Sequence, residues 1–207
     1  MSKHGGTRDG AGRKQLDKYE YVPHYVRTAR AGEHPVHVTA RAVPGLPSFR
    51  QHRLGSIMLL QLRRLNDEAF QIVHNSVQTN HLHMIVEADN RQTLSRKMGG
   101  FMASFAKRMN AELGRSGEVW RERFFSRDIT TARDMNNVLA YVFGNAKKHG
   151  QIPHDAALLD PFSSAWTFDG WDRPVELPPE ELRWTPPEPR TELLRRDWIA
   201  HGLLRVV

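Results

Sequence analysis

The sequence predicts an α+β protein, because short segments of strand-like alternation come in turn with longer segments of helical periodicity. Apolar and polar residues alternate in residues 34–43, two more strand-like segments follow each other closely in residues 70–88, and apolar residues recur at helical spacing in three other segments. The elements thus come in the order strand, helix, strand, strand, helix, strand, helix. This βαββαβα order is typical of a ferredoxin-like sandwich, in which helices cover an antiparallel sheet.

The first four elements lie between residues 34 and 88. Residues 34–43 alternate in the manner of a half-buried strand, and the turn PGLPS ends it. A helix is predicted over residues 49–69, and its apolar residues are Leu54, Ile57, Met58, Leu62 and Leu65. The segments FQIVHNSVQ, residues 70–78, and NHLHMIVEA, residues 80–88, then predict two neighbouring strands.

The last three elements follow Asn90. The apolar stripe of the second predicted helix consists of Leu94, Met98, Phe101, Phe105 and Met109. Residues 117–129, GEVWRERFFSRDI, come after a glycine turn and predict the fourth strand. Thr131 and Asp134 then have the spacing of a capping box, which predicts the start of a third helix.

Segments of different composition flank this domain, which we place at residues 34–150. Residues 1–33 are rich in glycine and basic residues without apolar periodicity, which predicts a flexible basic arm. Residues 151–207 are rich in proline and tryptophan and end in a short amphipathic segment. We expect a C-terminal tail with a short helix that packs back through its aromatic residues.

The composition favours a nucleic-acid partner. The 207 residues carry a formal net charge of +7 and include no cysteine. Lysine and arginine gain affinity for phosphates by releasing counterions, whereas the lack of cysteine excludes disulfides and thiolate metal sites. No apolar run is long enough to span a membrane. We therefore expect a cytoplasmic, nucleoid-associated protein with no membrane partner.

Two histidines one residue apart lie in the third predicted strand. Side chains alternate between faces, so His81 and His83 share one face and Leu82 shares the other with the core. The Cα atoms of the two histidines are then about 7 Å apart, from which both imidazoles can bind one ion. The first strand adds His37, Thr39 and Arg41 to this face if its valines point at the core, and such a face suits a phosphate backbone. Two half-exposed histidines on the solvent side of a sheet are the alternative.

The third predicted helix carries a polar stripe opposite its apolar one. The polar stripe consists of Asp134, Asn137, Tyr141, Asn145 and Lys148. Tyr141 is thus not where a core tyrosine is expected, and Asn145 follows it by one helical turn and points the same way. An amide oxygen at that place can bind a metal ion that also touches the phosphate attacked by the phenol. An ordinary surface tyrosine is the alternative.

Arginines recur in the fourth predicted strand. Alternation places one group of side chains together on one face, namely Arg121, Arg123, Phe125 and Arg127. The opposite face receives Trp120, Glu122 and Phe124. Arginines interleaved with an aromatic residue suit contacts with the backbone and bases of DNA, and a solvated charged face is the alternative.

Two motifs resemble those of a known family. NHLHMIV, residues 80–86, resembles the His-hydrophobic-His signature of the HUH single-strand endonucleases. AYVFGNAKKHG, residues 140–150, resembles the tyrosine helix of their single-tyrosine, IS200-like transposase branch, and in particular of the REP-associated tyrosine transposases. Residues 117–129 resemble the Trp-x-x-Arg-Phe stretch of that family. The family often has Asn-Pro where this chain has Asn145 followed by Ala146.

The resemblance implies a metal-dependent single-stranded DNA endonuclease and strand transferase that acts on hairpin, REP-like repeats during transposition. Tyr141 would attack a phosphodiester and leave a 5′-phosphotyrosine and a free 3′-hydroxyl. His81, His83 and Asn145 would hold Mg²⁺ or Mn²⁺, which suit two imidazoles and a hard oxygen. The residues expected to contact DNA are His37, Arg41, Arg121, Arg123, Arg127 and Lys148. The partner would be single-stranded DNA with a hairpin, bound by a monomer or a homodimer.

Two other functions stay open from the residues alone. A replication or mobilisation nickase would use the same chemistry on another substrate. A non-catalytic nucleic-acid-binding regulator would use the same ferredoxin-like sheet without a metal ion. Metal-dependent nicking of single strands separates the enzymes from the regulator.

Overall fold

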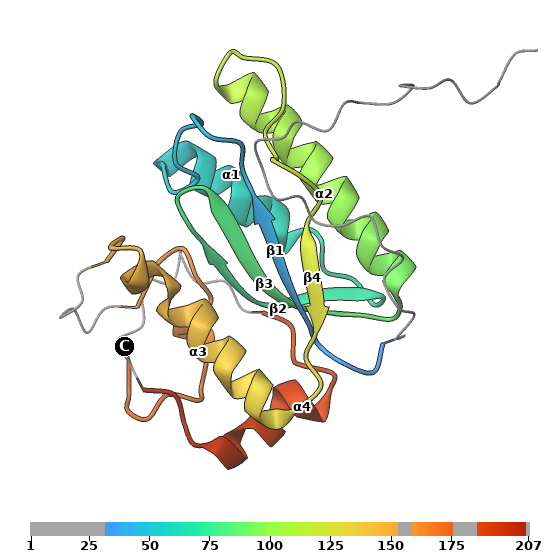
Figure 1. The fold of residues 1–207 in the computed structure, drawn as a ribbon, viewed down its shortest axis with the longest axis vertical. Helices are drawn as coiled ribbons and strands as arrows, with labels where there is room; N and C mark the ends of the chain where they lie inside the picture. The colour runs from blue at the N-terminus through green and yellow to red at the C-terminus, as the bar shows by residue number, and fades with distance from the viewer. Residues whose placement is uncertain (1–31, 153–158, 176–185, 206–207) are drawn as a thin grey trace, which may run out of the picture.

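Four antiparallel strands form one sheet in the order β2-β3-β1-β4 (Figure 1). The strands are β1 (Val36–Arg41), β2 (Phe70–Val77), β3 (His81–Ala88) and β4 (Phe125–Asp128). The predicted α+β class and the βαββαβα order are confirmed. The computed structural model describes residues 32–152, 159–175 and 186–205, so nearly all of the predicted N-terminal arm lies outside the described residues.

Helices cover both faces of this sheet. The helices α1 (His52–Arg63) and α2 (Arg91–Glu112) pack on one face, and α3 (Ala132–Lys148) packs on the other (Figure 1). The strand residues in the core under α1 and α2 include Val36, Val38, Ala40, Leu82, Met84 and Val86. Because these are every second residue of β1 and β3, the residues between them must point toward α3. None of the helices in the described part of the chain is long and apolar enough to cross a membrane.

The fourth strand is shorter than the sequence predicts. Regular pairing with β1 covers only Phe125–Asp128, and the preceding segment makes a single bridge between Trp120 and Ala42. The Trp120 indole donates a hydrogen bond to the carbonyl oxygen of Met102 and packs in the core under α2. This anchoring interrupts the alternation, so Glu122 lines the same pocket as the neighbouring arginines instead of the opposite face.

The C-terminal segment forms a second apolar cluster around α3. It contains the short helices η1 (Ala165–Thr167), α4 (Glu192–Arg195) and η3 (Asp197–His201). Its members in the cluster include Phe168, Trp171, Leu194, Trp198 and Leu204. They pack with residues of α3 such as Met135, Leu139, Val142 and Phe143. The tyrosine-bearing helix is therefore held between the sheet and the C-terminal segment.

A buried carboxylate fixes that segment to the sheet. Glu87 on β3 accepts hydrogen bonds from the backbone amides of Arg190 and Thr191, and also from the Thr191 hydroxyl. The Gln71 amide on β2 donates a further bond at 2.6 Å. Because a buried carboxylate left without partners is costly, these bonds tie the chain before α4 to the strands.

Candidate active site

His81 and His83 point from β3 toward α3, because their neighbours Leu82 and Met84 lie in the core on the opposite face. Their ring centroids are 4.9 Å apart and the rings are nearly perpendicular, at 87°. Both histidines are buried. The structure thus brings together, beneath α3, the two imidazoles that the sequence predicts as metal ligands.

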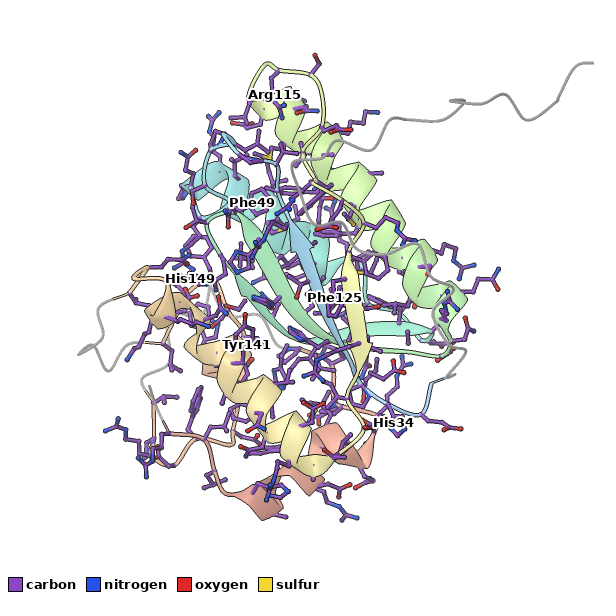
Figure 2. The ribbon with its side chains drawn as sticks, viewed as in Figure 1. His34, Phe49, Arg115, Phe125, Tyr141 and His149 are labelled. Atoms are coloured by element: carbon purple, nitrogen blue, oxygen red, sulfur yellow. The ribbon has the colours of Figure 1, made fainter. Side chains whose placement is uncertain are left out.

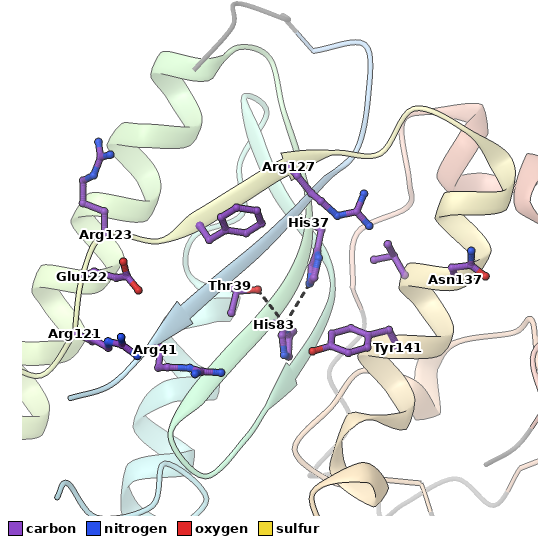
Figure 3. A pocket seen from close by; sticks show the side chains of 12 residues that line it. His37, Thr39, Arg41, His83, Arg121, Glu122, Arg123, Arg127, Asn137 and Tyr141 are labelled. Atoms are coloured by element: carbon purple, nitrogen blue, oxygen red, sulfur yellow. Dashed lines mark hydrogen bonds between the residues drawn. The ribbon is translucent and has the colours of Figure 1, made fainter. Parts of the chain in front are cut away.

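Tyr141 lies on the side of α3 that meets these histidines. Its ring centroid is 5.1 Å from that of His83 and 6.1 Å from that of His37. Figure 3 shows the Tyr141 hydroxyl next to His83, at the edge of a pocket between the sheet and α3. Although the ring packs on two buried histidines, the residue remains 41% exposed. Tyr141 is therefore accessible to a ligand that enters the pocket.

The predicted polar stripe required Asn145 to be exposed like Tyr141, but the structure does not show this. It is fully buried, whereas Asn137 and Tyr141 are exposed. Four residues advance an α-helix by one full turn and about 40° more. That rotation carries Asn145 from the accessible edge of α3 to the side that faces the histidines of β3.

Several buried polar atoms near Tyr141 have no hydrogen-bond partner among the described residues. They are Nε2 of His83 and both amide atoms of Asn145. Nδ1 of His81 lies 2.9 Å from Oδ1 of Asn80, so the Nδ1 proton can be donated there and the Nε2 lone pair remains available. Leaving such atoms unpaired is costly, and a cation would satisfy the lone pairs of Nε2 of His83 and Oδ1 of Asn145.

The residues present therefore fit a divalent cation. His81, His83 and Asn145 offer two imidazole nitrogens and an amide oxygen, a donor set compatible with Mg²⁺ or Mn²⁺. Within the part of the chain that the structure describes, no three His, Asp or Glu side chains are grouped to hold a metal ion. The proposed set differs from such a group because its third ligand is the amide of Asn145 and not a histidine or a carboxylate.

Burial keeps the histidines of this cluster neutral. Desolvation lowers the pKa of His37 to about 4, with a smaller contribution from Arg127. Desolvation, followed by the charges of Arg41 and His149, lowers the pKa of His81 to about 4, and the nearby Asn145 amide opposes that shift. The pKa of His83 is also lowered, mainly by burial and then by His81. Neutral imidazole is the form that binds metal ions.

We expect this burial to make folding sensitive to acid. Unfolded histidines have a pKa near 6.5, so below that pH the unfolded chain takes up protons that folded His37 and His81 do not bind until about pH 4. The stabilisation is complete above about pH 6.5 and is lost as the pH falls toward 4. Each histidine contributes up to about 2 kcal/mol to the difference between pH 7 and pH 5.

Urea unfolding at the two pH values measures this difference. Replacing the buried His37 by Gln should reduce the loss of stability at pH 5, because the side chain then has no proton to take up in the unfolded state. Replacing His52, an exposed histidine on α1, should leave the loss unchanged. Equal stability of the parent protein at both pH values would contradict the expectation.

A basic pocket of about 760 Å³ opens beside Tyr141 (Figure 3). Its rim carries four of the arginines predicted to contact DNA, namely Arg41, Arg121, Arg123 and Arg127. Arg127 is also paired through two hydrogen bonds with Asp134 at the start of α3. Lys148 does not line the pocket, but its Nζ lies 5.3 Å from the Tyr141 ring centroid. His37 lies at the floor and is buried, which makes it a poor candidate for an exposed DNA contact.

Two further residues lie near the histidines, and only His149 was not placed beside them by the sequence patterns. The Thr39 hydroxyl lies 3.1 Å from Nδ1 of His83. The His149 ring centroid lies 5.3 Å from that of His81. Thr39 lies on the same face as His37, as the alternation of β1 predicts, and it pairs with His83 across the sheet. His149 directly follows α3. It comes four residues after Asn145, which itself comes four residues after Tyr141.

Comparisons with known proteins relate this chain to transposases. Residues 51–145 match the family model described as "Transposase IS200 like". No curated protein matches the sequence.

A solved structure is similar in fold. It is described as a REP-associated tyrosine transposase bound to a REP hairpin, and it superposes with a TM-score of 0.51 at 19% sequence identity. The similarity covers 70% of this chain and 83% of that one. It therefore extends beyond the residues that the family model matches.

Proposed function

We propose that the protein is a metal-dependent single-stranded DNA endonuclease and strand transferase in which Tyr141 is the nucleophile. The observation that carries the proposal is the contact of Tyr141 with His83, 5.1 Å between ring centroids, beside the buried and unpaired amide of Asn145. Tyr141 of α3 and His83 of β3 line one pocket, with His81 next to His83 and Asn145 about one turn after Tyr141. The match of residues 51–145 to the model of a transposase family supports the same chemistry.

The proposed reaction exchanges one phosphoester bond for another. The Tyr141 oxygen forms a bond to phosphorus, and the bond from phosphorus to the 3′-oxygen breaks. The phenol loses one proton in this step, and the leaving 3′-oxygen gains one. The products are a 5′-phosphotyrosine and a free 3′-hydroxyl, and attack by another 3′-hydroxyl releases Tyr141 and joins the strands. A bound Mg²⁺ or Mn²⁺ would polarise the phosphate oxygens. His81, His83 and Asn145 would hold that ion next to Tyr141.

The basic pocket supports a DNA substrate. Its arginines suit contacts with phosphates, and the similar structure was solved with a REP hairpin, so a hairpin with a single-stranded flank is the proposed substrate. A transposase with such a substrate would act in the cytoplasm, as a monomer or a homodimer.

The experiment that tests the proposal is the detection of a covalent adduct. The protein is incubated with a labelled hairpin oligonucleotide that carries a single-stranded flank, with and without Mn²⁺, and then run on a denaturing gel. A shifted, labelled band that requires Mn²⁺ is expected. Tight binding with no adduct on any single-stranded substrate would instead favour a non-catalytic regulator.

We expect Asn145→Ala to lower Mn²⁺ affinity and cleavage, by about 100-fold in rate, because it removes a ligand that ties α3 to the histidines. Misplacing a reacting group by about 1 Å costs on the order of a hundredfold. Calorimetric titration with Mn²⁺ and the rate of adduct formation measure the two effects.

Asn137→Ala is the matched control for Asn145→Ala. Asn137 lines the pocket one turn before Tyr141 but is exposed, so its loss should change both quantities by less than about threefold. Asp134 is unsuitable as a control, because its carboxylate binds the pocket residue Arg127. Equal, small effects of the two asparagine variants would show that another group is the third ligand.

A further inference from the structure

An aromatic side chain stands exposed on the edge strand beside the basic pocket. Phe125 on β4 is 46% exposed and lines the pocket together with Tyr141 (Figure 2). The core residue that precedes it, Phe124, is buried. Burying a phenylalanine side chain is favourable by roughly 1.5–3 kcal/mol, so an exposed one in a pocket is a candidate for contact with a ligand.

The register of the sheet fixes where this ring lies relative to the histidines. Thr39 on β1 pairs with His83 on one side and with Phe125 on the other, so these three residues form one row across the sheet. Residues in one row point to the same face, and neighbouring strands are about 4.8 Å apart. Phe125 is therefore roughly 10 Å from His83 along the sheet, within reach of a nucleotide next to the reacting phosphate.

The charges around Phe125 match a nucleic-acid strand and not an apolar ligand. Arg121 and Arg123 precede it, Arg127 follows it, and Arg41 lies on the neighbouring strand, and all four line the same pocket. Cations that flank an exposed aromatic ring are the arrangement by which proteins bind single strands, with phosphates on the cations and a base on the ring. A base inside a duplex is stacked on its neighbours and offers no free face to such a ring.

We propose that Phe125 is the stacking platform for one unpaired base adjacent to the cleaved phosphodiester, and that it selects single-stranded over duplex DNA at this site. The inference rests on the proposed function, because it deepens the description of the same pocket. Arg121, Arg123 and Arg41 then hold the phosphates on either side of the stacked nucleotide, and Tyr141 faces the next phosphate.

The test uses a hairpin oligonucleotide with a single-stranded flank in which 2-aminopurine replaces one base at a time. Stacking quenches the fluorescence of 2-aminopurine. The fluorescence from one position next to the cleavage site should therefore be quenched when the oligonucleotide binds to the parent protein. Phe125→Ala should abolish the quenching there and weaken binding by about 5- to 150-fold, the range expected for one stacked base. Phe125→Tyr should retain both.

A matched control is Leu60→Ala. Leu60 is 43% exposed on α1, on the other side of the sheet, and its loss should change neither quenching nor affinity. Annealing a complementary strand to the flank should remove the difference in quenching and affinity between the Phe125→Ala variant and the parent protein. Unchanged quenching and affinity in Phe125→Ala would overturn the stacking role even if the parent forms an adduct. Absence of an adduct with position-specific quenching intact would count against the proposed reaction alone.

A second inference concerns His37, which lies under the pocket and pairs with His83. Nε2 of His37 is 3.2 Å from Nδ1 of His83, and the two rings stack with centroids 5.3 Å apart. If His83 carried its proton on Nε2, that buried N–H would have no acceptor among the described residues. With the proton on Nδ1, His83 can donate to His37 or to the Thr39 hydroxyl, and its Nε2 lone pair is free to bind a cation.

We infer that His37 is a positioning residue that accepts a hydrogen bond from Nδ1 of His83 and so presents Nε2 of His83 to a metal ion. Metal-binding histidines are commonly oriented in this way by a partner on the other ring nitrogen.

Nitrogen NMR of the metal-free protein reads the tautomers directly. His83 should carry its proton on Nδ1 and His37 should be unprotonated on Nε2. His37→Ala should weaken Mn²⁺ binding by about 10- to 100-fold, and His37→Gln, whose amide oxygen can accept, should restore much of it. Thr39→Val removes the hydroxyl of Thr39, which is the other possible acceptor for Nδ1 of His83. A proton found on Nε2 of His83, or unchanged Mn²⁺ affinity in a folded His37→Ala protein, would overturn the inference.

Discussion

Tyr141→Phe is expected to abolish the covalent adduct with single-stranded DNA, by at least about a thousandfold in rate, and to leave DNA affinity nearly unchanged. Only the nucleophilic oxygen is removed. The phenyl ring can keep its contacts with His83 and His37, so the position of α3 should not change. Adduct formation on a denaturing gel and affinity from fluorescence anisotropy measure the two quantities on the same oligonucleotide.

The remaining tyrosines make this experiment decisive. They are Tyr19, Tyr21 and Tyr25, and they lie outside the described residues. An adduct that survives Tyr141→Phe would assign the nucleophile to one of them. Loss of DNA affinity together with the adduct would show that the hydroxyl also binds the strand.

His81→Ala and His83→Ala are each expected to lower Mn²⁺ affinity and cleavage by more than about 100-fold. Loss of groups that merely orient metal ligands already costs about 10- to 100-fold, so loss of a ligand should cost more. An excess of chelator should reproduce the loss of cleavage in the parent protein. Calorimetry with Mn²⁺ separates a loss of binding from a loss of chemistry.

His52→Ala is the control for general effects of removing a histidine. His52 is exposed at the start of α1, on the face of the sheet away from Tyr141. Its replacement should leave Mn²⁺ affinity and cleavage unchanged. Full cleavage by the parent protein in excess chelator would rule out the assignment of His81 and His83 as ligands of a catalytic metal ion.

The face of the sheet that carries the histidines could be predicted because strand geometry has a period of two. Once Val38 and Leu82 are placed in the core, His37 and His83 must lie opposite. The burial of that face could not be predicted in the same way. It results from α3 and the C-terminal segment, whose docking depends on contacts between residues far apart in the sequence.

The sequence patterns did not predict the environment of individual residues where a tertiary contact competes with local geometry. Trp120 enters the core and ends the regular alternation before Phe125, so the fourth strand is short. Asn145 belongs to the polar stripe by composition, yet the rotation of the helix buries it. His37 was expected to contact DNA, but it is buried and lies against His83.

The packing of the C-terminal segment on α3 has a consequence for how the protein can be divided. A fragment that stops at the end of α3 would leave the apolar side of that helix, including Met135, Leu139 and Phe143, facing water. It would also leave the Glu87 carboxylate without the amides that now bind it. Helix α3 and the segment after it should therefore unfold in a single cooperative transition, and we expect that neither can be exchanged between homologues as an independent module.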